Sequence, residues 1–312
     1  MILCLGTTPT VQRTMTFNHL TLDAVNRAAN VLESASGKSL NVARTLHTLG
    51  REVLAIGFLG GDTGELIRAD LDRAGIPHDF VAVKPKTRTC TTVIDNATKK
   101  VTELVEETSP VDTAAYDRLL KIIDANLNRT RVLVLSGSLP PQAPQDFYAR
   151  CTHLARRANI PVILDTRGEP LRLALAEKPT VVKPNRHELQ ESVSFPIDDD
   201  ASLQAAIREL IRQGPRWAII THGPLDAIAS DGESFWRITP PKIAAINPIG
   251  SGDAFAAGLA IALLEGRDLP TACRLGAACG AANALNSPAG HGRREDVERL
   301  SPEVRITSMQ IQ

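Results

Sequence analysis

Short apolar runs of four or five residues recur along most of the chain and alternate with segments of helical spacing. Two clear runs are Arg131–Leu135 and Pro161–Asp165, and a helical pattern from Gln145 to about Asn159 lies between them. The scheme continues with apolar runs at Thr180–Lys183 and Trp217–Thr221 and helical patterns at Arg186–Glu191 and Ala201–Gln213. Alternation of strands and helices predicts an α/β fold in which helices cover both faces of a mostly parallel sheet.

Three of these apolar runs end at a polar residue, namely Asp165, Lys183 and Thr221. Ligands of open parallel sheets bind outside the carboxyl ends of the strands. We therefore expect the functional site along this edge of the sheet. Asp165 is expected either to lie beside bound phosphates or to serve a structural role.

Two segments, residues 10–34 and 86–108, depart from the alternation. Threonine and valine alternate there with polar residues, as in Thr89–Ile94 and Val101–Val105. This pattern predicts antiparallel strands that are exposed on at least one face, in a small sheet that serves as a lid or meets a partner subunit. The sequence shows no repeat and no clear linker, so we expect residues 1–312 to form one domain with an attached lid.

The composition narrows the classes of function. Lys+Arg and Asp+Glu both number 35, which removes any bulk attraction to nucleic acid or to an anionic membrane. No apolar stretch approaches about 18 residues, so no membrane span is expected. The five cysteines are scattered and never spaced as CxxC, which favours buried thiols in the cytoplasm over zinc or disulfides. The first residues, MILCLG, predict a strand and not a signal peptide.

The segment Gly250-Ser251-Gly252-Asp253 stands directly before a stretch of helical spacing that reaches about Glu265. Glycines permit a tight turn and a close ligand approach, and a helix start presents unpaired N–H groups at its positive end. The turn therefore predicts an anion-binding site, with Asp253 placed to take a proton from an attacking hydroxyl. A plain helix cap is the alternative for Asp253 when this segment is considered alone.

Companion motifs favour the functional interpretation. The chain resembles the ribokinase-like (PfkB) carbohydrate kinases, in the branch of 1-phosphofructokinase, minor-type 6-phosphofructokinase and tagatose-6-phosphate kinase. The resemblance runs from residue 1 to about residue 295, and four motifs carry it in order: Val25–Arg27 with Gly37–Arg44, Ser136–Pro141, Lys183–Glu188 and Asn247–Asp253. It implies a three-layer α/β/α sandwich with a small β-sheet lid.

The resemblance also implies an ATP-dependent kinase that transfers the γ-phosphoryl group to a hydroxyl of a phosphorylated ketohexose or a related sugar. Asp253 is then the catalytic base, and the backbone of Gly250, Ser251 and Gly252 forms the anion hole. Mg²⁺ is expected to be held through its waters by Asn185 and Glu188, although Glu188 as a solvated surface carboxylate is the alternative. The residues implied to bind the nucleotide are Lys183, Asn185, Thr221, Gly223 and Asn283; a packed structural role is equally open for Asn283.

On the acceptor side, three cations stand where the phosphorylated-sugar branch contacts the sugar phosphate: Arg27, Lys38 and Arg88. Asn41 could hydrogen-bond sugar hydroxyls, while Arg44 is open to either a binding or a structural role. Gly37 and Ser138 belong to the two turns that the resemblance places around the sugar.

The departures from the family pattern gather on the acceptor side. Gln12 replaces the aspartate that commonly accepts hydrogen bonds from sugar hydroxyls, and Ser36-Gly37-Lys38-Ser39 replaces a Gly-Gly-Lys-Gly turn. In the nucleotide turn, the usual glycine appears as Asp226. An amide both donates and accepts, and losing a charge-assisted hydrogen bond typically costs about 1.5–3 kcal/mol, so we expect an altered sugar preference or pose.

Two other functions compete with the kinase. A non-catalytic sugar-phosphate sensor would fit the loss at position 12, but it has no need of the intact Gly250–Asp253 segment. A nicotinamide dehydrogenase would rest on Gly57–Gly61 and Gly64, but their spacing is not GxGxxG, and Gly60–Gly64 favours a loop that opens a helix. His47, His187 and His222 lack metal-ligand spacing, and no chemistry is assigned to Cys90. A homodimer through the lid strands and dependence on a monovalent cation stay open.

Overall fold

The computed structural model describes residues 1–193 and 195–310 of the chain. Within these residues, one sheet has ten strands in the order β14-β13-β12-β11-β10-β9-β8-β1-β4-β5. Neighbouring strands are parallel from β11 to β5. This parallel part consists of β1 (Ile2–Gly6), β4 (Val53–Leu59), β5 (His78–Ala82), β8 (Val132–Ser136), β9 (Val162–Asp165), β10 (Val181–Val182) and β11 (Trp217–His222). An antiparallel extension follows with β12 (Leu225–Ser230), β13 (Phe235–Thr239) and β14 (Arg305–Met309).

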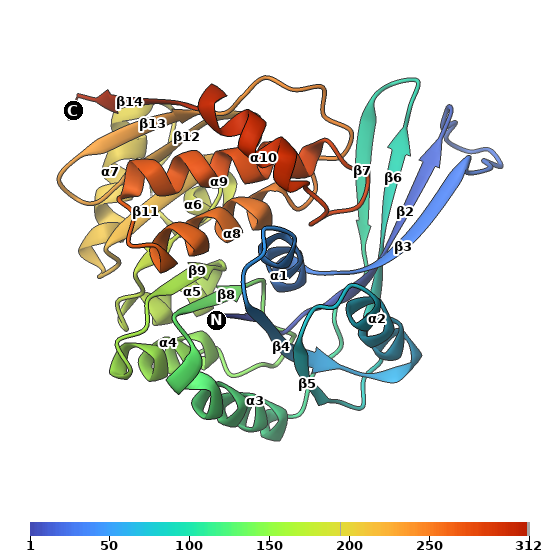
Figure 1. Ribbon diagram of the computed structural model, residues 1–312, viewed down its shortest axis with the longest axis horizontal. Coiled ribbons are helices and arrows are strands. Elements are labelled where there is room, and N and C mark those ends of the chain that lie inside the picture. The colour runs from blue at the N-terminus through green and yellow to red at the C-terminus, as the bar shows by residue number, and fades with distance from the viewer. Residues whose placement is uncertain (194, 311–312) are drawn as a thin grey trace.

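Helices cover both faces of this sheet, which gives the predicted three layers (Figure 1). One core contains side chains of α1 (Lys38–Thr48), α2 (Gly61–Arg73), α8 (Ser251–Leu264), α9 (Leu269–Ala284) and α10 (Arg294–Leu300). The opposite core contains those of α3 (Thr113–Asn126), α4 (Phe147–Arg157), α5 (Gly168–Leu175), α6 (Arg186–Ser192) and α7 (Asp200–Arg212). Alternate residues of β1 serve the two cores: Ile2 and Cys4 enter the first, Leu3 and Leu5 the second.

The helix that begins at the Gly250 turn is held tightly against its neighbour. A Cβ at Gly258 of α8 would lie 2.6 Å from the Cα of Gly276 in α9, and a Cβ at Gly276 would lie 2.7 Å from the Phe255 ring. The absence of side chains at these two positions lets the helices approach closely. Because α8 is apolar on nearly every side and buried, this packing fixes where its N-terminus lies.

The predicted lid is a separate sheet. In the described residues it has four strands in the order β3-β2-β6-β7, with β2 (Thr10–Phe17), β3 (Asn30–Ser36), β6 (Arg88–Asp95) and β7 (Lys100–Val105). Figure 1 shows these strands projecting from the body beyond α1 and α2. The expectation of purely antiparallel strands is wrong in one respect: β2 and β6 pair in parallel, because the chain crosses the main sheet between them.

Short 3₁₀ turns complete the chain at Leu127–Arg129 and Ser301–Glu303. None of the helices in the described residues combines the length and apolar character that a membrane span requires. Each cysteine of the sequence is a free, buried thiol, as expected from the scattered spacing.

Candidate active site

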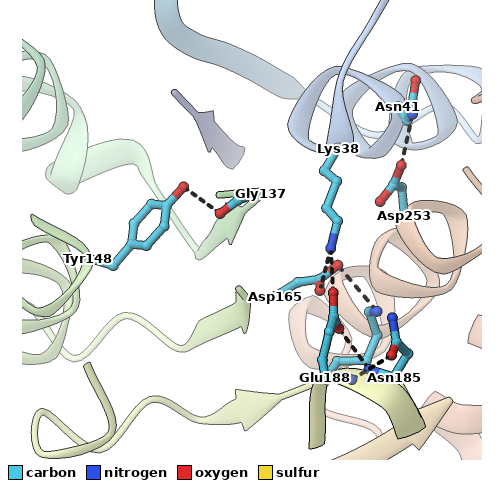
Figure 2. Close-up of polar contacts among 9 residues, drawn as sticks. Lys38, Asn41, Gly137, Tyr148, Asp165, Asn185, Glu188 and Asp253 are labelled. Carbon is cyan, nitrogen blue, oxygen red and sulfur yellow. Dashed lines mark hydrogen bonds and ion pairs between the residues drawn. The ribbon is translucent and has the colours of Figure 1, made fainter. Parts of the chain in front are cut away.

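A cluster of opposite charges lies at the carboxyl ends of the central strands, at the edge of the sheet that the sequence predicts. Asp165 is the last residue of β9, and Lys183 directly follows β10. Lys183 Nζ lies 3.2 Å from Asp165 Oδ2, and Lys38 Nζ lies 3.3 Å from Oδ1. Lys38 Nζ also lies 3.5 Å from Glu188 Oε1 (Figure 2). Two cations and two carboxylates, from α1, β9, α6 and the segment that follows β10, thus lie close together.

The charges set one another's ionisation. Burial opposes the charged form of Asp165, but Lys183 and Lys38 together lower its pKa below the ordinary value. In turn Asp165 raises the pKa of the Lys38 ammonium against the effect of burial, and Glu188 and Asp253 add to the rise. Lys38 is therefore held in its charged state, which suits the binding of anionic phosphates.

The Gly250 turn has the geometry of an anion-binding helix start. Gly250 is the N-cap residue of α8, and its φ of 83° is in the left-handed region that favours glycine. The N–H of Ser251 donates to the carbonyl of Pro248 at 3.1 Å, so it is not the free donor that the sequence predicts. Among the described residues, the N–H groups of Gly250, Gly252 and Asp253 have no acceptor. Of the three predicted donors, Gly250 and Gly252 therefore stay available to an anion, and Asp253 adds another.

Asp253 lies in the first turn of α8 and is only 6% exposed. Burial raises the pKa of Asp253 to about 7, and the nearby charge of Asp165 adds to the rise. Lys38, the hydrogen bond from Asn41 and Lys183 act in the opposite direction and lower this pKa. Asn41 Nδ2 donates to Asp253 Oδ2 at 2.8 Å. A carboxylate with a pKa near neutrality is suited to act as a general base at physiological pH.

Two buried asparagines brace the turn. Asn283 of α9 donates through Nδ2 to the Ile249 carbonyl at 2.9 Å and to Ser251 Oγ at 3.2 Å, and its Oδ1 accepts from the Gly290 N–H. Asn247 accepts from the Ile249 N–H at 3.1 Å. Asn283 is fully buried, which supports the packed role left open from the sequence; its contact with a nucleotide stays a prediction.

Asn185 and Glu188 form a capping box at the start of α6. Asn185 Oδ1 accepts from the Glu188 N–H, and Glu188 Oε2 accepts from the Asn185 N–H, both at 2.9 Å. The other carboxylate oxygen, Glu188 Oε1, lies 3.5 Å from Lys38 Nζ. Glu188 is 8% exposed, so the alternative of a solvated surface carboxylate is wrong.

The carboxylates fit a hydrated magnesium ion better than a protein-enclosed metal centre. Asp165 Oδ2 is buried and accepts no hydrogen bond of normal geometry, although Lys183 is within ion-pair distance. Across residues 1–193 and 195–310, no group of three or more His, Cys, Asp or Glu side chains is arranged to hold a metal ion. Mg²⁺ commonly uses one or two carboxylates, its own waters and substrate phosphates, which matches Asp165 and Glu188. Direct participation of Asn185 stays a prediction.

Thr221 and Gly223 lie at the end of β11 and in the turn that follows. The Thr221 N–H bonds the Pro184 carbonyl at 3.2 Å, which places Thr221 beside the Lys183–Glu188 segment. Gly223 is exposed with a φ of 56°, and a Cβ there would meet nothing within 4 Å. The assignment of Asp226 to this turn is wrong, because Asp226 lies in β12 and its Oδ2 pairs with Arg237 at 3.4 Å.

The predicted acceptor residues fall into three different environments. Gln12 is buried in lid strand β2, and its Nε2 donates to Thr92 Oγ1 at 2.8 Å. Arg88 donates to the backbone carbonyls of Thr8 and Glu106, so two of its nitrogens support the lid. Arg27 lies exposed in the loop between β2 and β3. Sugar-phosphate contacts by Arg27 and Arg88 stay predictions.

The central loop after β8 is fixed from both sides. Tyr148 donates through its hydroxyl to the Gly137 carbonyl at 3.0 Å, and Thr7 donates to the Ser138 carbonyl at 3.0 Å. Ser138 itself is exposed. A Cβ at Gly137 would lie 3.9 Å from the Lys38 Cβ, so this loop borders the charged cluster. A sugar contact by Ser138 or Gly37 stays a prediction.

Sequence reasoning missed several supporting residues. Arg44, left open as a binding or structural residue, pairs with Asp70 of α2 at 2.5 Å in a buried contact, which favours the structural role. Tyr148, Thr7 and Asn247 were given no role. Their partners are backbone carbonyls or distant side chains, and no local spacing points to such contacts. The only available signal was the polar character of residues within otherwise apolar segments.

Residues 1–295 match the family described as pfkB family carbohydrate kinase. A possible 1-phosphofructokinase from Thermotoga maritima is similar with a TM-score of 0.90 at 20% identity, over 99% of this chain and 100% of that chain. Phosphofructokinase-2 from Escherichia coli, solved in complex with potassium, is similar with a TM-score of 0.87 at 25% identity, over 97% of this chain and 98% of that chain.

Proposed function

The chain belongs to the pfkB family of carbohydrate kinases, and from this premise we propose that it is an ATP-dependent sugar-phosphate kinase. Its acceptor in this proposal is a phosphorylated ketohexose or a related sugar. The observation that carries the proposal is the position of Asp253: a buried carboxylate with a raised pKa directly beside the donor groups of the Gly250 turn.

In the proposed reaction, the Asp253 carboxylate takes the proton from the acceptor hydroxyl as the hydroxyl oxygen bonds the γ-phosphorus. The bond between that phosphorus and the oxygen bridging to the β-phosphate breaks, and ADP leaves with the electron pair. The N–H groups of Gly250, Gly252 and Asp253 support charge on the moving phosphoryl group. Lys183 and Lys38 supply fixed positive charge near the phosphates.

Asp165 and Glu188 are the residues that would hold Mg²⁺ through its waters, with Asn185 at the same helix start. When bound, the ion would supply positive charge to the phosphate oxygens. The protein's own contribution is to keep Asp165 ionised, which Lys183 and Lys38 favour. Thr221 and Gly223 form the turn proposed to receive the nucleotide phosphates, with Asn283 behind the anion hole.

The proposal of a phosphorylated acceptor rests on cations near the lid. Lys38 is half-buried and points from the start of α1 into the cluster, while Arg88 lies at the base of the lid. Escherichia coli phosphofructokinase-2, which is 25% identical, has been solved in complex with fructose-6-phosphate. This supports a sugar phosphate as acceptor for the present chain, with Arg27, Lys38 and Arg88 as candidates for the phosphate contact.

Gln12 supports an acceptor preference or pose that differs from the family's usual one. Its amide is buried and donates to Thr92, so its remaining polar atom toward a ligand is the carbonyl Oε1. A neutral carbonyl accepts more weakly than a carboxylate. Replacing Gln12 by Glu, with Gln12→Met as the matched apolar control, should change the ratio of kcat/KM between sugar phosphates by roughly tenfold or more. Equal kcat/KM ratios in wild type, Gln12→Glu and Gln12→Met would show that Gln12 does not determine the sugar preference.

A non-catalytic sensor descended from such kinases is the competing function. The charged cluster and the buried Asp253 favour the kinase, because a sensor needs neither a base nor an anion hole. A homodimer through the lid is proposed from the exposed apolar side chains of Val31, Leu32, Leu104 and Val105 on its outer strands. A monovalent cation requirement and a cytoplasmic location stay predictions.

The experiment for the proposed function is ADP release with a panel of acceptors and MgATP. The panel contains fructose 1-phosphate, fructose 6-phosphate and tagatose 6-phosphate beside the unphosphorylated sugars. The kinase proposal expects ADP release with at least one sugar phosphate and little with the unphosphorylated sugars. Binding of a sugar phosphate without ADP release would favour the sensor.

A further inference from the structure

The site contains one contact that the proposed function does not use. Asn41 was expected to bind sugar hydroxyls, yet both ends of its amide meet protein groups (Figure 2 shows the Asp253 side). Nδ2 donates to Asp253 Oδ2 at 2.8 Å, and Oδ1 accepts from the Ser36 hydroxyl at 2.9 Å. Asn41 is 4% exposed, so little of its side chain is open to a ligand.

The direction of this hydrogen-bonded chain has a chemical consequence. An amide donates at one end and accepts at the other. With its carbonyl occupied by Ser36, Asn41 presents a donor to Asp253, and a donor favours a carboxylate over the protonated acid. We propose that Asn41, held by Ser36, is a positioning residue that keeps Asp253 in the ionised form and the orientation needed to accept the proton of the acceptor hydroxyl. The inference rests on the proposed role of Asp253.

Ser36 is held firmly enough to serve this role. It is the last residue of lid strand β3, and its side chain is buried. The preceding residue, Ala35, donates its N–H to Asp70 Oδ2 at 3.0 Å, and Arg44 of α1 pairs with the same oxygen. The carboxylate of Asp70 thus fixes the strand end to α1 and α2.

Other groups act on Asp253, and the proposal needs Asn41 to be a distinct one. Lys38 approaches from α1 and Lys183 from the end of β10, and both favour the carboxylate. Asp165 of β9 and burial in the protein oppose it. Within the described residues, Asn41 is the side chain that donates a hydrogen bond to the Asp253 carboxylate. A Cβ at Gly250 would lie 3.4 Å from Asn41 Nδ2, so the amide also borders the anion hole.

The test measures kcat and the acceptor KM from pH 5.5 to 9 for Ser36→Ala and Asn41→Leu. Without the oriented donor, the acidic limb of the kcat profile should move upward by about half a pH unit or more. Turnover at pH 7 should fall about three- to tenfold, while the acceptor KM changes by less than about threefold. Thr45→Val is the matched control. It also removes a hydroxyl that donates to Asn41, but this hydroxyl bonds the backbone carbonyl of Asn41 and not its side-chain amide.

A rise in the acceptor KM with an unmoved acidic limb would overturn the proposal and assign Asn41 to the sugar. Should Asn41→Leu fail to fold, Ser36→Ala keeps the amide and carries the same prediction. Asp253→Asn distinguishes a failure of the proposed function from a failure of the role proposed for Asn41. If that variant keeps its turnover, the proposed function fails; if it loses turnover while Ser36→Ala and Asn41→Leu match wild type, only this inference fails.

Discussion

Lys38 Nζ lies 3.3 Å from Asp165 Oδ1, although 127 residues separate the two in the sequence. The contact joins the start of α1, the first helix of the chain, to the carboxyl end of β9. Lys183 occupies the other oxygen of the same carboxylate at 3.2 Å. The buried anion therefore holds two cations at the place where phosphates are expected, so the positive charge is in position before a substrate binds.

Replacing Lys38 by Met should lower kcat by at least about 10²-fold, because it removes a fixed charge from the phosphate site. The change also leaves Asp165 with a single cation. Lys86→Met is the matched control, since Lys86 pairs with Asp62 on the exposed surface, and we expect it to stay within about twofold of wild type. Steady-state ADP release measures both. Equal effects of the two substitutions would show that Lys38 has no special role.

The edge of the sheet that carries the site could be predicted from local pattern. Asp165, Lys183 and Thr221 each follow an apolar strand run, and parallel strands bring their carboxyl ends together. The Gly250 turn could also be predicted, because glycines spaced in this way before an apolar helix favour a tight turn at the helix start. The lid was predicted from alternating polar and β-branched residues.

The contacts that tune the site could not be predicted, because they join residues far apart in the chain. The Asn41–Asp253 pair spans 212 positions. A sugar contact by Asn41 stays a prediction, and no local pattern indicates that its amide donates to Asp253. The Ser251 N–H was counted as a free donor, but the carbonyl of Pro248 occupies it. Asp226 was placed in a turn because hairpin boundaries are weakly encoded, and it lies in the following strand.

Gly250→Ala should reduce both stability and turnover. The residue has φ 83°, and an added Cβ would lie 2.8 Å from the Ala289 Cβ and 3.4 Å from Asn41 Nδ2. We expect a loss of roughly 1–3 kcal/mol in the free energy of unfolding and at least about a tenfold loss in kcat. Gly266→Ala is the control, because Gly266 has φ 67° but nothing within 4 Å of its Cβ position. It should lose about 1 kcal/mol of stability with kcat unchanged; an equal fall in kcat would contradict the account.

Asp253→Asn should stabilise the protein above neutral pH. Burial raises the pKa of Asp253 from 3.8 to about 7, so between these values the folded state binds more protons than the unfolded state. Stability from this group is therefore present at low pH and is lost as pH rises toward 7. The advantage of the variant in free energy of unfolding should grow by about 2 kcal/mol from pH 5.5 to pH 8. Denaturant titrations at both pH values measure it, and a constant difference would argue against a raised pKa.

The pH dependence of wild-type kcat should reflect the ionisation of the Asp253 carboxyl. Because the base must be ionised, kcat should rise with pH, reach half its maximum near pH 7 and level off above it. Stopped assays of ADP formation at saturating substrate, in buffers of constant ionic strength, provide the profile. A kcat that is flat from pH 5.5 to 8 would mean that no group with this pKa limits turnover.

The most direct measurement is the turnover number of Asp253→Asn with the sugar phosphate that wild type uses best. The substitution keeps the size of the side chain and removes its ability to take a proton. The account predicts that ADP formation falls by at least about 10²-fold while the variant stays folded and still binds the sugar phosphate. A variant that forms ADP within a fewfold of the wild-type rate would contradict the assignment of residue 253 as the base.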